Sequence, residues 1–192
     1  MEPTLPEWTL EPLALYLELL DRWNSAQALT ALGKADRFEE LILDSAALLP
    51  WLQDLPPHSR VVDFGTGMGI PALPIALARP DLEVVALDKS RKKIAFVRQA
   101  ALELGLGNLV PLAGPAEALP PLGAHGGVAK AVGTLDLLGA WWRRHGRPGA
   151  PFWALKGSQG PLVPPAGFSL RIHPYRLPSR GDRLVVELRA SG

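Results

Sequence analysis

The chain has 192 residues, with 20 Lys and Arg residues against 19 Asp and Glu residues, so its net charge is +1. Hydrophobic residues make up 47% of the sequence and charged residues 20%, which is typical of a folded globular protein and excludes a disordered one. The absence of cysteine excludes disulfides, thiolate metal sites and a cysteine nucleophile.

Neither a secretory leader nor a membrane span is expected. Residues 1–10 carry two prolines and two glutamates, where a leader would have a basic and then an apolar segment. The apolar stretch 72–78 is short and is interrupted by Pro74. The four histidines are dispersed and show no metal-ligand spacing. We therefore expect a cytoplasmic protein that has no bound metal and no membrane partner.

The first part of the chain is predicted to be helical. Apolar residues at helical spacing predict one helix over 12–24 and a second over 36–49, with Asp36 as the N-cap of the second helix and Pro50 as its end. The pair Pro56-Pro57 follows. We therefore expect an N-terminal helical cap over residues 1–57, followed by one compact unit over residues 58–192.

From residue 60 onward, short apolar strands alternate with helices. Strands are expected over residues 60–64, 83–87, 108–112, 127–131 and 151–155, and helices over residues 70–78, 90–104 and 135–144. Two more strands, 169–174 and 183–188, are expected to form a C-terminal hairpin. This alternation predicts an α/β fold in which a mostly parallel sheet carries helices on both faces.

A glycine-rich turn, Gly65-Thr66-Gly67-Met68-Gly69, follows the first of these strands. Glycines allow a sharp turn and a close approach to a ligand, and the next helix offers free N–H groups at its start. A dinucleotide fingerprint would need glycine at position 70, which is Ile70, and no P-loop pattern is present. The spacing G-x-G-x-G is instead typical of methyltransferases that bind S-adenosylmethionine.

Two carboxylates support this interpretation. Asp63 lies just before the turn, where an acidic group can pair with the ammonium of a methionine moiety, directly or through water. Asp88 ends the second strand, where it can accept both ribose hydroxyls. The alternative is that Asp88 only caps the helix that begins near Ser90. We predict S-adenosylmethionine as the cofactor, held by residues of the turn and these two carboxylates: Asp63, Gly65, Thr66, Gly67, Gly69 and Asp88.

From Trp23 onward the sequence resembles the RsmG (GidB) family of bacterial small-subunit ribosomal RNA methyltransferases. Several family motifs occur in the right order: Trp23-Asn24 with Leu29-Thr30 (W-N-x-x-x-N-L-T), Leu43-Asp44-Ser45 (H-x-L-D-S), Val62–Pro71 (D-x-G-[TS]-G-x-G-x-P), Asp88 with Lys92-Lys93 and Phe96-Val97-Arg98 (D-S-x-x-K-R-x-x-F-L), and Ala154–Gly157 (A-L-K-G). The resemblance runs over most of the chain.

The resemblance implies the fold and the reaction. The fold would be the Rossmann-like class I fold of S-adenosylmethionine-dependent methyltransferases, and the acceptor would be guanine N7 of small-subunit (16S) ribosomal RNA. Ala116 and Glu117 match the end of the family's G-R-A-E motif and join the cofactor-binding set. The partner would be ribosomal RNA or the small ribosomal subunit.

The sequence also departs from the family pattern. The asparagine of N-L-T is Ala28, the histidine of H-x-L-D-S is Leu41, and the arginine of G-R-A-E is Pro115. The S-R-A motif is Ala129-Lys130-Ala131, and the R-H-L-V-V pattern is Arg183-Leu184-Val185, with no histidine. Two alternatives therefore stay open: a divergent paralog that acts on another acceptor, and a non-catalytic protein that associates with RNA or the ribosome.

Methylation at guanine N7 needs no general base, because N7 carries a lone pair and no proton. Lys130 and Lys156 lie at predicted strand ends, where ligands bind in open α/β sheets, and we predict them beside the substrate. Lys92, Lys93 and Arg98 are predicted to contact RNA phosphates. The Trp141-Trp142 pair, which precedes a second basic group over residues 143–147, is either a stacking platform or, for at least one ring, part of the core.

Overall fold

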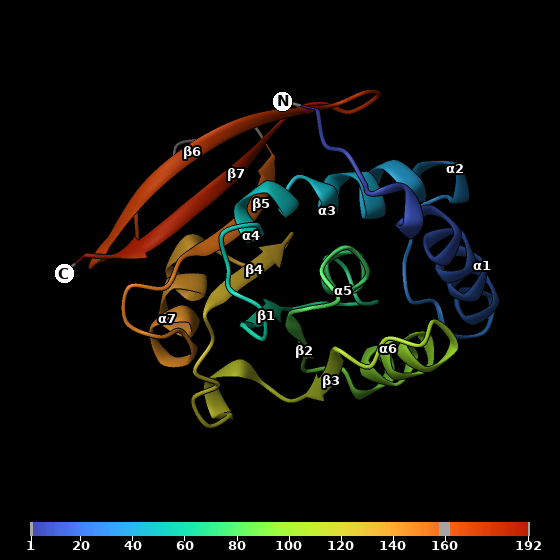
Figure 1. The fold of residues 1–192 in the computed structure, drawn as a ribbon, viewed down its shortest axis with the longest axis horizontal. Helices are drawn as coiled ribbons and strands as arrows, with labels where there is room; N and C mark the ends of the chain where they lie inside the picture. Colours follow the sequence, from blue (N-terminus) through green and yellow to red (C-terminus); the bar gives the residue numbers. More distant parts are fainter. Residues whose placement is uncertain (1, 158–161, 192) are drawn as a thin grey trace.

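The computed structural model describes residues 2–157 and 162–191. Figure 1 shows one central sheet with helices packed against both of its faces. The sheet has seven strands in the order β3-β2-β1-β4-β5-β7-β6. The predicted α/β fold is confirmed. The strands are β1 (Arg60–Phe64), β2 (Glu83–Asp88), β3 (Leu109–Ala113), β4 (Gly126–Lys130), β5 (Phe152–Gly157), β6 (Phe168–Leu177) and β7 (Gly181–Ala190).

The first five strands are parallel, and the last two form an antiparallel hairpin. Strand β7 runs antiparallel to both β5 and β6, so the hairpin extends the sheet beyond β5. Each hairpin strand has ten residues, longer than predicted. The sequence suggested an end at Pro174, but β6 is the edge strand, where a missing N–H leaves no ladder bond unmade.

The N-terminal part is helical, but the predicted helix over 36–49 is divided. Its central part is a π-helical segment, which takes more residues per turn than an α-helix. The prediction that Pro50 ends the helix is wrong, because Pro50 lies in the first turn of α4, where a missing N–H costs nothing. The helical segments are η1 (Glu7–Thr9), α1 (Leu10–Gln27), α2 (Lys34–Arg37), η2 (Phe38–Leu43), α3 (Asp44–Ala46) and α4 (Leu49–Leu52).

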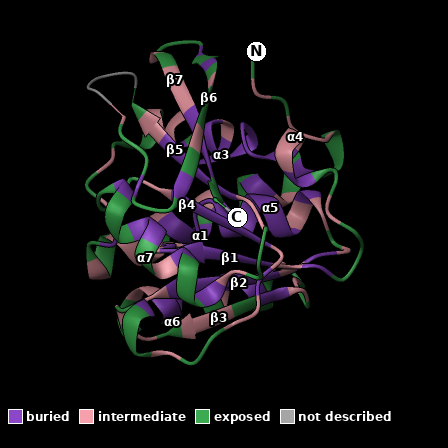
Figure 2. Cartoon of the chain, turned by 90° about the vertical axis from the view of Figure 1, so that its left-hand side faces the viewer, coloured by how far each residue is buried: buried purple, intermediate pink, exposed green. Residues whose placement is uncertain are grey.

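Alternating side chains of the strands build two apolar layers. On β1, Val61 belongs to one layer, whereas Val62 and Phe64 belong to the other. The first layer is covered by α1 to α4, α5 (Ala72–Ala78) and α6 (Arg91–Glu103), and the second by η3 (Ala116–Ala118) and α7 (Leu135–His145). Figure 2 shows that the central strands are largely buried and that exposed residues lie on the outer sides of the helices.

Helix α1 packs against α6 and the glycine turn. The Tyr16 hydroxyl donates a hydrogen bond to the Met68 carbonyl at 3.0 Å, and the Trp23 ring lies edge-on to Phe96. After the helix, Asn24 Oδ1 accepts the Thr30 N–H at 2.8 Å. Buried residues of the N-terminal helices and of the sheet form one core cluster, while the domain boundary at residue 57 stays a prediction. Within residues 2–157 and 162–191, no helix is long and apolar enough to cross a membrane.

Candidate functional site

The glycine turn requires its glycines. Gly65, Gly67 and Gly69 have φ angles of +71°, +58° and +92°, a region that other residues enter only with strain. The N–H groups of Gly65 and Thr66 both donate to the Leu87 carbonyl, at 2.8 and 2.9 Å. A Cβ atom on Gly65 would lie 2.5 Å from a Val132 methyl group. The turn is therefore hydrogen-bonded to the end of β2, and the Val132 side chain, which follows β4, packs closely against it.

Asp88 connects the end of β2 to the turn and to α6. Its Oδ2 accepts the Gly67 N–H at 2.9 Å, and its Oδ1 accepts the Ser90 N–H at 2.8 Å. The N-cap of α6 is Ser90, whose Oγ accepts the Lys93 N–H at 3.4 Å. Asp88 therefore does more than cap the helix, since it also fixes the turn and faces a pocket.

Asp63 lies behind the turn and is completely buried. Its Oδ2 accepts the Ala72 N–H at 3.1 Å, whereas its Oδ1 has no hydrogen-bond partner among the described residues. Burial raises the pKa of Asp63 to about 7. A buried acceptor without a donor costs free energy, so a donor group that arrived with a ligand or a water molecule would stabilise this carboxyl.

A pocket of about 760 Å³ opens beside the turn. We call it the glycine-turn pocket; its lining includes Gly65, Asp88, Ala116, Glu117, Val132 and Trp141. It unites four of the residues predicted to bind the cofactor, whereas Asp63, Thr66, Gly67 and Gly69 do not line it. A carboxylate at the end of β2, an aromatic wall and a turn with three glycines suit the ribose, the base and the amino-acid portion of S-adenosylmethionine.

The two adjacent tryptophans on α7 have different surroundings. Trp142 is buried and donates from Nε1 to the Ala150 carbonyl at 3.1 Å. Trp141 stacks on Phe64, with 5.8 Å between ring centroids, and lines the glycine-turn pocket. The prediction that at least one ring belongs to the core is confirmed. The sequence around Trp141 does not indicate that this residue lies near the turn, because the packing of α7 against the sheet brings it there.

The basic residues over 143–147, which follow these tryptophans, hold neighbouring loops through hydrogen bonds to backbone carbonyls. Arg144 and Arg147 donate to the Leu119 and Gly123 carbonyls. His145 is buried, its Nε2 lies 2.8 Å from the Ala116 carbonyl oxygen, and burial lowers its pKa. Arg143 donates to the Ala166 carbonyl and lies over the Phe168 ring at 5.2 Å. These side chains therefore hold the segments that border the glycine-turn pocket.

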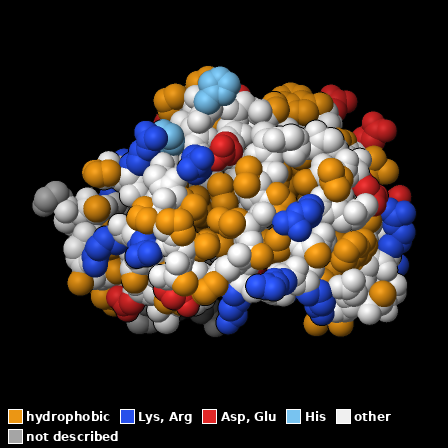
Figure 3. Space-filling model, turned by 90° about the horizontal axis from the view of Figure 1, so that it is seen from below, with side chains coloured by type: hydrophobic (Ala, Val, Ile, Leu, Met, Phe, Trp, Pro, Cys, Tyr) orange, Lys and Arg blue, Asp and Glu red, His pale blue; other side chains and the backbone are white. Residues whose placement is uncertain are grey.

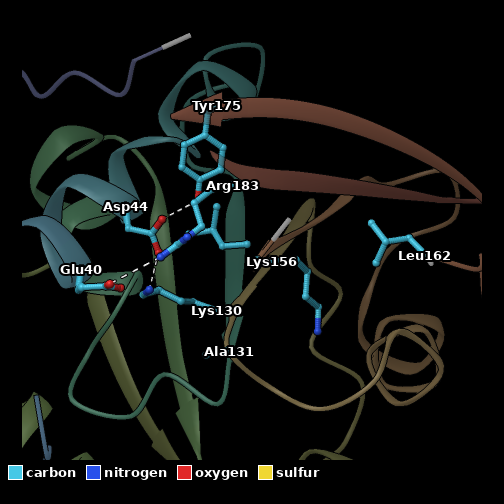
Figure 4. A pocket seen from close by; sticks show the side chains of 10 residues that line it. Glu40, Asp44, Lys130, Ala131, Lys156, Leu162, Tyr175 and Arg183 are labelled. Carbon is cyan, nitrogen blue, oxygen red and sulfur yellow. Dashed lines mark hydrogen bonds and ion pairs between the residues drawn. The ribbon is translucent and has the colours of Figure 1, made fainter. Parts of the chain in front are cut away.

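A second pocket, of about 510 Å³, lies at the carboxyl ends of β4 and β5 (Figure 4). We call it the strand-end pocket; its lining includes Glu40, Asp44, Lys130, Lys156, Tyr175 and Arg183. Asp44 is almost fully buried, with one oxygen paired to the Lys130 ammonium and the other accepting the Tyr175 hydroxyl. Burial and the Asp44 charge raise the pKa of Tyr175 far above its usual range.

The two pockets meet along the segment 130–132. Lys130 and Ala131 line the strand-end pocket, and Val132 lines the glycine-turn pocket. The Lys156 ammonium donates to the Gly133 carbonyl at 2.9 Å, and burial lowers the pKa of this lysine. The structure therefore brings Lys130 and Lys156 together at one pocket, as predicted from their strand ends.

Several lining residues of the strand-end pocket were not predicted as site residues, among them Glu40, Tyr175 and Arg183. Glu40 lies in the π-helical segment η2, and Tyr175 and Arg183 lie on the terminal hairpin. Only Arg183 carried a signal, as the arginine of the R-H-L-V-V pattern. Tyr175 and Asp44 are 131 residues apart in sequence, so no local spacing could have paired them.

The predicted RNA-binding residues lie on α6, outside both pockets. Lys92 and Arg98 are exposed, and Lys93 is half-buried. Lys92 Nζ donates to the Gln27 carbonyl at 2.5 Å. Figure 3 shows a group of Lys and Arg side chains along one edge of the face seen from below. In the part of the chain that the structure describes, no three His, Asp or Glu side chains are placed to hold a metal ion.

The fold and the glycine-turn pocket define the class of the S-adenosylmethionine-dependent methyltransferases. A structure of such an enzyme from Aquifex aeolicus aligns with a TM-score of 0.60 at 18% identity, over 80% of this chain and 92% of that one, which shows the shared fold. The TrmN structure from Thermus thermophilus gives a TM-score of 0.60 at 27% identity, over 76% of this chain and 48% of that one.

The chain belongs to the GidB family, whose model, described as rRNA small subunit methyltransferase G, matches residues 9–161. A relative from Yersinia pestis (strain Pestoides F), "Ribosomal RNA small subunit methyltransferase G", is 39% identical over 161 residues, which cover 80% of this chain and 74% of the relative. The predicted family, the fold class and the cofactor S-adenosylmethionine are thereby confirmed. The roles of individual site residues stay predictions.

Proposed function

We propose that this enzyme transfers the methyl group of S-adenosylmethionine to N7 of a guanine in 16S ribosomal RNA, with the cofactor in the glycine-turn pocket and the guanine in the strand-end pocket. The observation that carries this proposal is that consecutive residues line the two pockets, Lys130 and Ala131 one and Val132 the other, which puts a cofactor-type pocket next to a pocket rich in hydrogen-bonding groups. Family membership supports the ribosomal RNA acceptor.

S-adenosylmethionine supplies an electrophilic methyl group when bound. Asp88 would accept the ribose hydroxyls, Ala116 and Glu117 would border the adenine, and Asp63 would face the ammonium directly or through water. The turn formed by Gly65, Thr66, Gly67 and Gly69 would let the backbone approach the cofactor closely. These roles agree with the carboxylate at the end of β2 and with the unpartnered buried oxygen of Asp63.

The acceptor side has to hold the base and exclude water, because the N7 lone pair attacks without loss of a proton. Lys156 lies where its ammonium can donate to guanine O6 while keeping its bond to the Gly133 carbonyl. Lys130 is oriented by Asp44 and contributes a second cation at the same wall. Both lysines therefore position the base, and neither needs to act as an acid or a base.

The RNA outside the pocket would contact α6 through Lys92, Lys93 and Arg98. We propose the cytoplasm as the location, since that is where ribosomal RNA is available. The small ribosomal subunit is the proposed partner, with naked 16S RNA as the alternative substrate form.

Nucleoside analysis of small-subunit RNA from a strain that lacks this chain tests the proposal. We expect N7-methylguanosine to be lost and to return when the purified enzyme and S-adenosylmethionine are added to that strain's particles or RNA. If N7-methylguanosine is unchanged by the deletion, guanine N7 of 16S RNA is not the acceptor. Calorimetry with S-adenosylmethionine separately tests the cofactor pocket.

A further inference from the structure

We propose that Glu40 recognises the target guanine in the strand-end pocket, by accepting its N1–H and N2–H groups. This inference rests on the proposed function and adds the residue that determines base specificity. It comes from the distribution of charges in the pocket, which holds two carboxylates, Glu40 and Asp44, among the cations Lys130, Lys156 and Arg183.

The chemistry of the base decides which of its edges the protein can bind. N7 has to face the methyl donor, and O6 beside it is the acceptor that Lys156 is proposed to bind, so any further recognition of the base has to use its other edge. The remaining edge carries two adjacent donors, N1–H and the N2 amino group. A carboxylate offers two acceptors to this pair, whereas adenine presents an acceptor at N1 and would repel it.

The two carboxylates differ in the partners that hold them. Asp44 uses both oxygens, one for Lys130 and one for the Tyr175 hydroxyl. Glu40 is held by two guanidinium groups, with its Oε1 3.0 Å from Arg180 Nε and 3.6 Å from Arg183. Glu40 is therefore the carboxylate of this pocket that is not hydrogen-bonded to both Lys130 and Tyr175, and we assign the base to it.

The fold holds this carboxylate in place. Glu40 lies in the π-helical segment four residues before Asp44, and such segments are frequent at functional sites. Figure 4 shows Glu40 and Lys130 pointing toward one another at the same side of the pocket, with Arg183 next to the Glu40 carboxylate. Its side chain is 21% exposed and lines the pocket, and the guanidinium groups offset the desolvation of its charge.

The test uses two RNA substrates that differ at one atom group. The position methylated by the wild-type enzyme is mapped first, and RNA is then assembled with guanosine or inosine at that position. Inosine keeps N7, O6 and N1–H but lacks the N2 amino group. For the wild-type enzyme we expect inosine to lower kcat/KM by about tenfold or more, as for loss of a hydrogen bond to a charged group.

The decisive comparison is the ratio of kcat/KM on the two RNAs in the variant Glu40→Gln and in the wild type. The amide group of the variant has one acceptor oxygen and one donor NH2 group in place of two acceptor oxygens, so we expect lower kcat/KM on guanosine RNA and less than about a threefold difference between the two RNAs. Competition binding of the two RNAs gives a second readout without turnover. Glu40→Asp keeps a carboxylate and should retain a preference for guanosine.

Asp36→Asn is the matched control, because Asp36 contacts Arg180 at 2.5 Å but does not line the pocket. In this variant, inosine should lower kcat/KM by the same factor as in the wild type. If inosine costs the same factor in wild type and in Glu40→Gln, the assignment of Glu40 is wrong while the methyltransferase remains. If the wild-type enzyme forms no N7-methylguanosine on any of these RNAs, the proposed function itself fails.

Discussion

The buried carboxyl of Asp63 makes the stability of the enzyme depend on pH near neutrality. Burial raises its pKa from 3.8 to about 7, and the nearby Asp88 charge acts in the same direction. Between these values the folded chain binds more protons than the unfolded chain. The contribution of this group is therefore fully present below pH 3.8 and is lost as the pH rises through about 7.

We predict that Asp63→Asn is more stable than the wild type at high pH. Asparagine keeps the acceptor for the Ala72 N–H but carries no buried charge. Because a shift of one pKa unit corresponds to ~1.4 kcal/mol, the advantage of the variant should grow by about 2–3 kcal/mol between pH 5 and pH 8. Urea denaturation at several pH values measures this, and parallel profiles for the two proteins would contradict it.

The Asp44 carboxylate gives a second prediction at the scale of single residues. Lys130→Ala removes the ion-pair partner of an almost fully buried carboxylate, so the free energy of unfolding should fall by about 3 kcal/mol. Lys130→Arg keeps the charge and should cost less than ~1 kcal/mol. Denaturant unfolding of both variants checks this. Equal losses would show that volume rather than charge matters at this position.

The cofactor side of the site was predictable from sequence because it is local. Gly65, Gly67, Gly69 and Asp88 lie within one strand–turn–helix–strand unit, so their spacing alone carried the information. The acceptor side is not local. Glu40 and Tyr175 come from segments at opposite ends of the chain, and they meet only because the hairpin and η2 border the same pocket.

At the scale of elements, regular strands were predictable and irregular helices were not. Strand β1 has the predicted bounds, and β2 to β5 lie within two residues of theirs. The apolar spacing over 36–49 fits an α-helix equally well, so nothing in it indicated the π-helical segment. The hairpin strands extend beyond their apolar cores because backbone pairing between β6 and β7 runs to the turn at Gly181.

The tip of this hairpin, residues 178–180, forms ion pairs and hydrogen bonds with the N-terminal helical segments. Arg180 pairs with Asp36 and Glu40. The Ser179 hydroxyl donates to Glu39 Oε2 and the Ser179 N–H to Glu39 Oε1, and these bonds lower the pKa of Glu39. We predict that Arg180→Ala lowers the free energy of unfolding by about 1 kcal/mol at low salt, because exposed ion pairs contribute little each. The loss should shrink in 1 M salt.

Hydrogen exchange localises the effect. In Arg180→Ala, the amides of the hairpin tip and of η2 should exchange faster than in the wild type. Arg176→Ala is the control, because Arg176 pairs only within the hairpin, with Asp182 at 3.2 Å, and both side chains are about two-thirds exposed. If both variants change exchange at η2 equally, the contact of the tip with the helices is not responsible.

At the scale of the whole molecule, a net charge of +1 gives no general attraction to RNA, so affinity has to come from local groups. The structure distinguishes two basic clusters. Arg143, Arg144 and Arg147 donate to backbone carbonyls of loops, and Lys92 donates to the Gln27 carbonyl, but Lys92 and Arg98 lie exposed together on one helix, α6. Together with Lys93, the latter are the better candidates for phosphate contacts.

Salt dependence of RNA binding separates the two clusters. Each phosphate contact contributes about −0.7 to −0.9 to the slope of log K against log salt concentration. The triple variant Lys92→Ala, Lys93→Ala and Arg98→Ala should therefore flatten the slope by about 2 units if all three contact phosphates. The variant Arg143→Ala with Arg147→Ala removes two charges but should leave the slope unchanged and lower the stability, because these side chains hold loops. An unchanged slope in the α6 variant, measured on 16S RNA, would place the RNA on another face of the molecule.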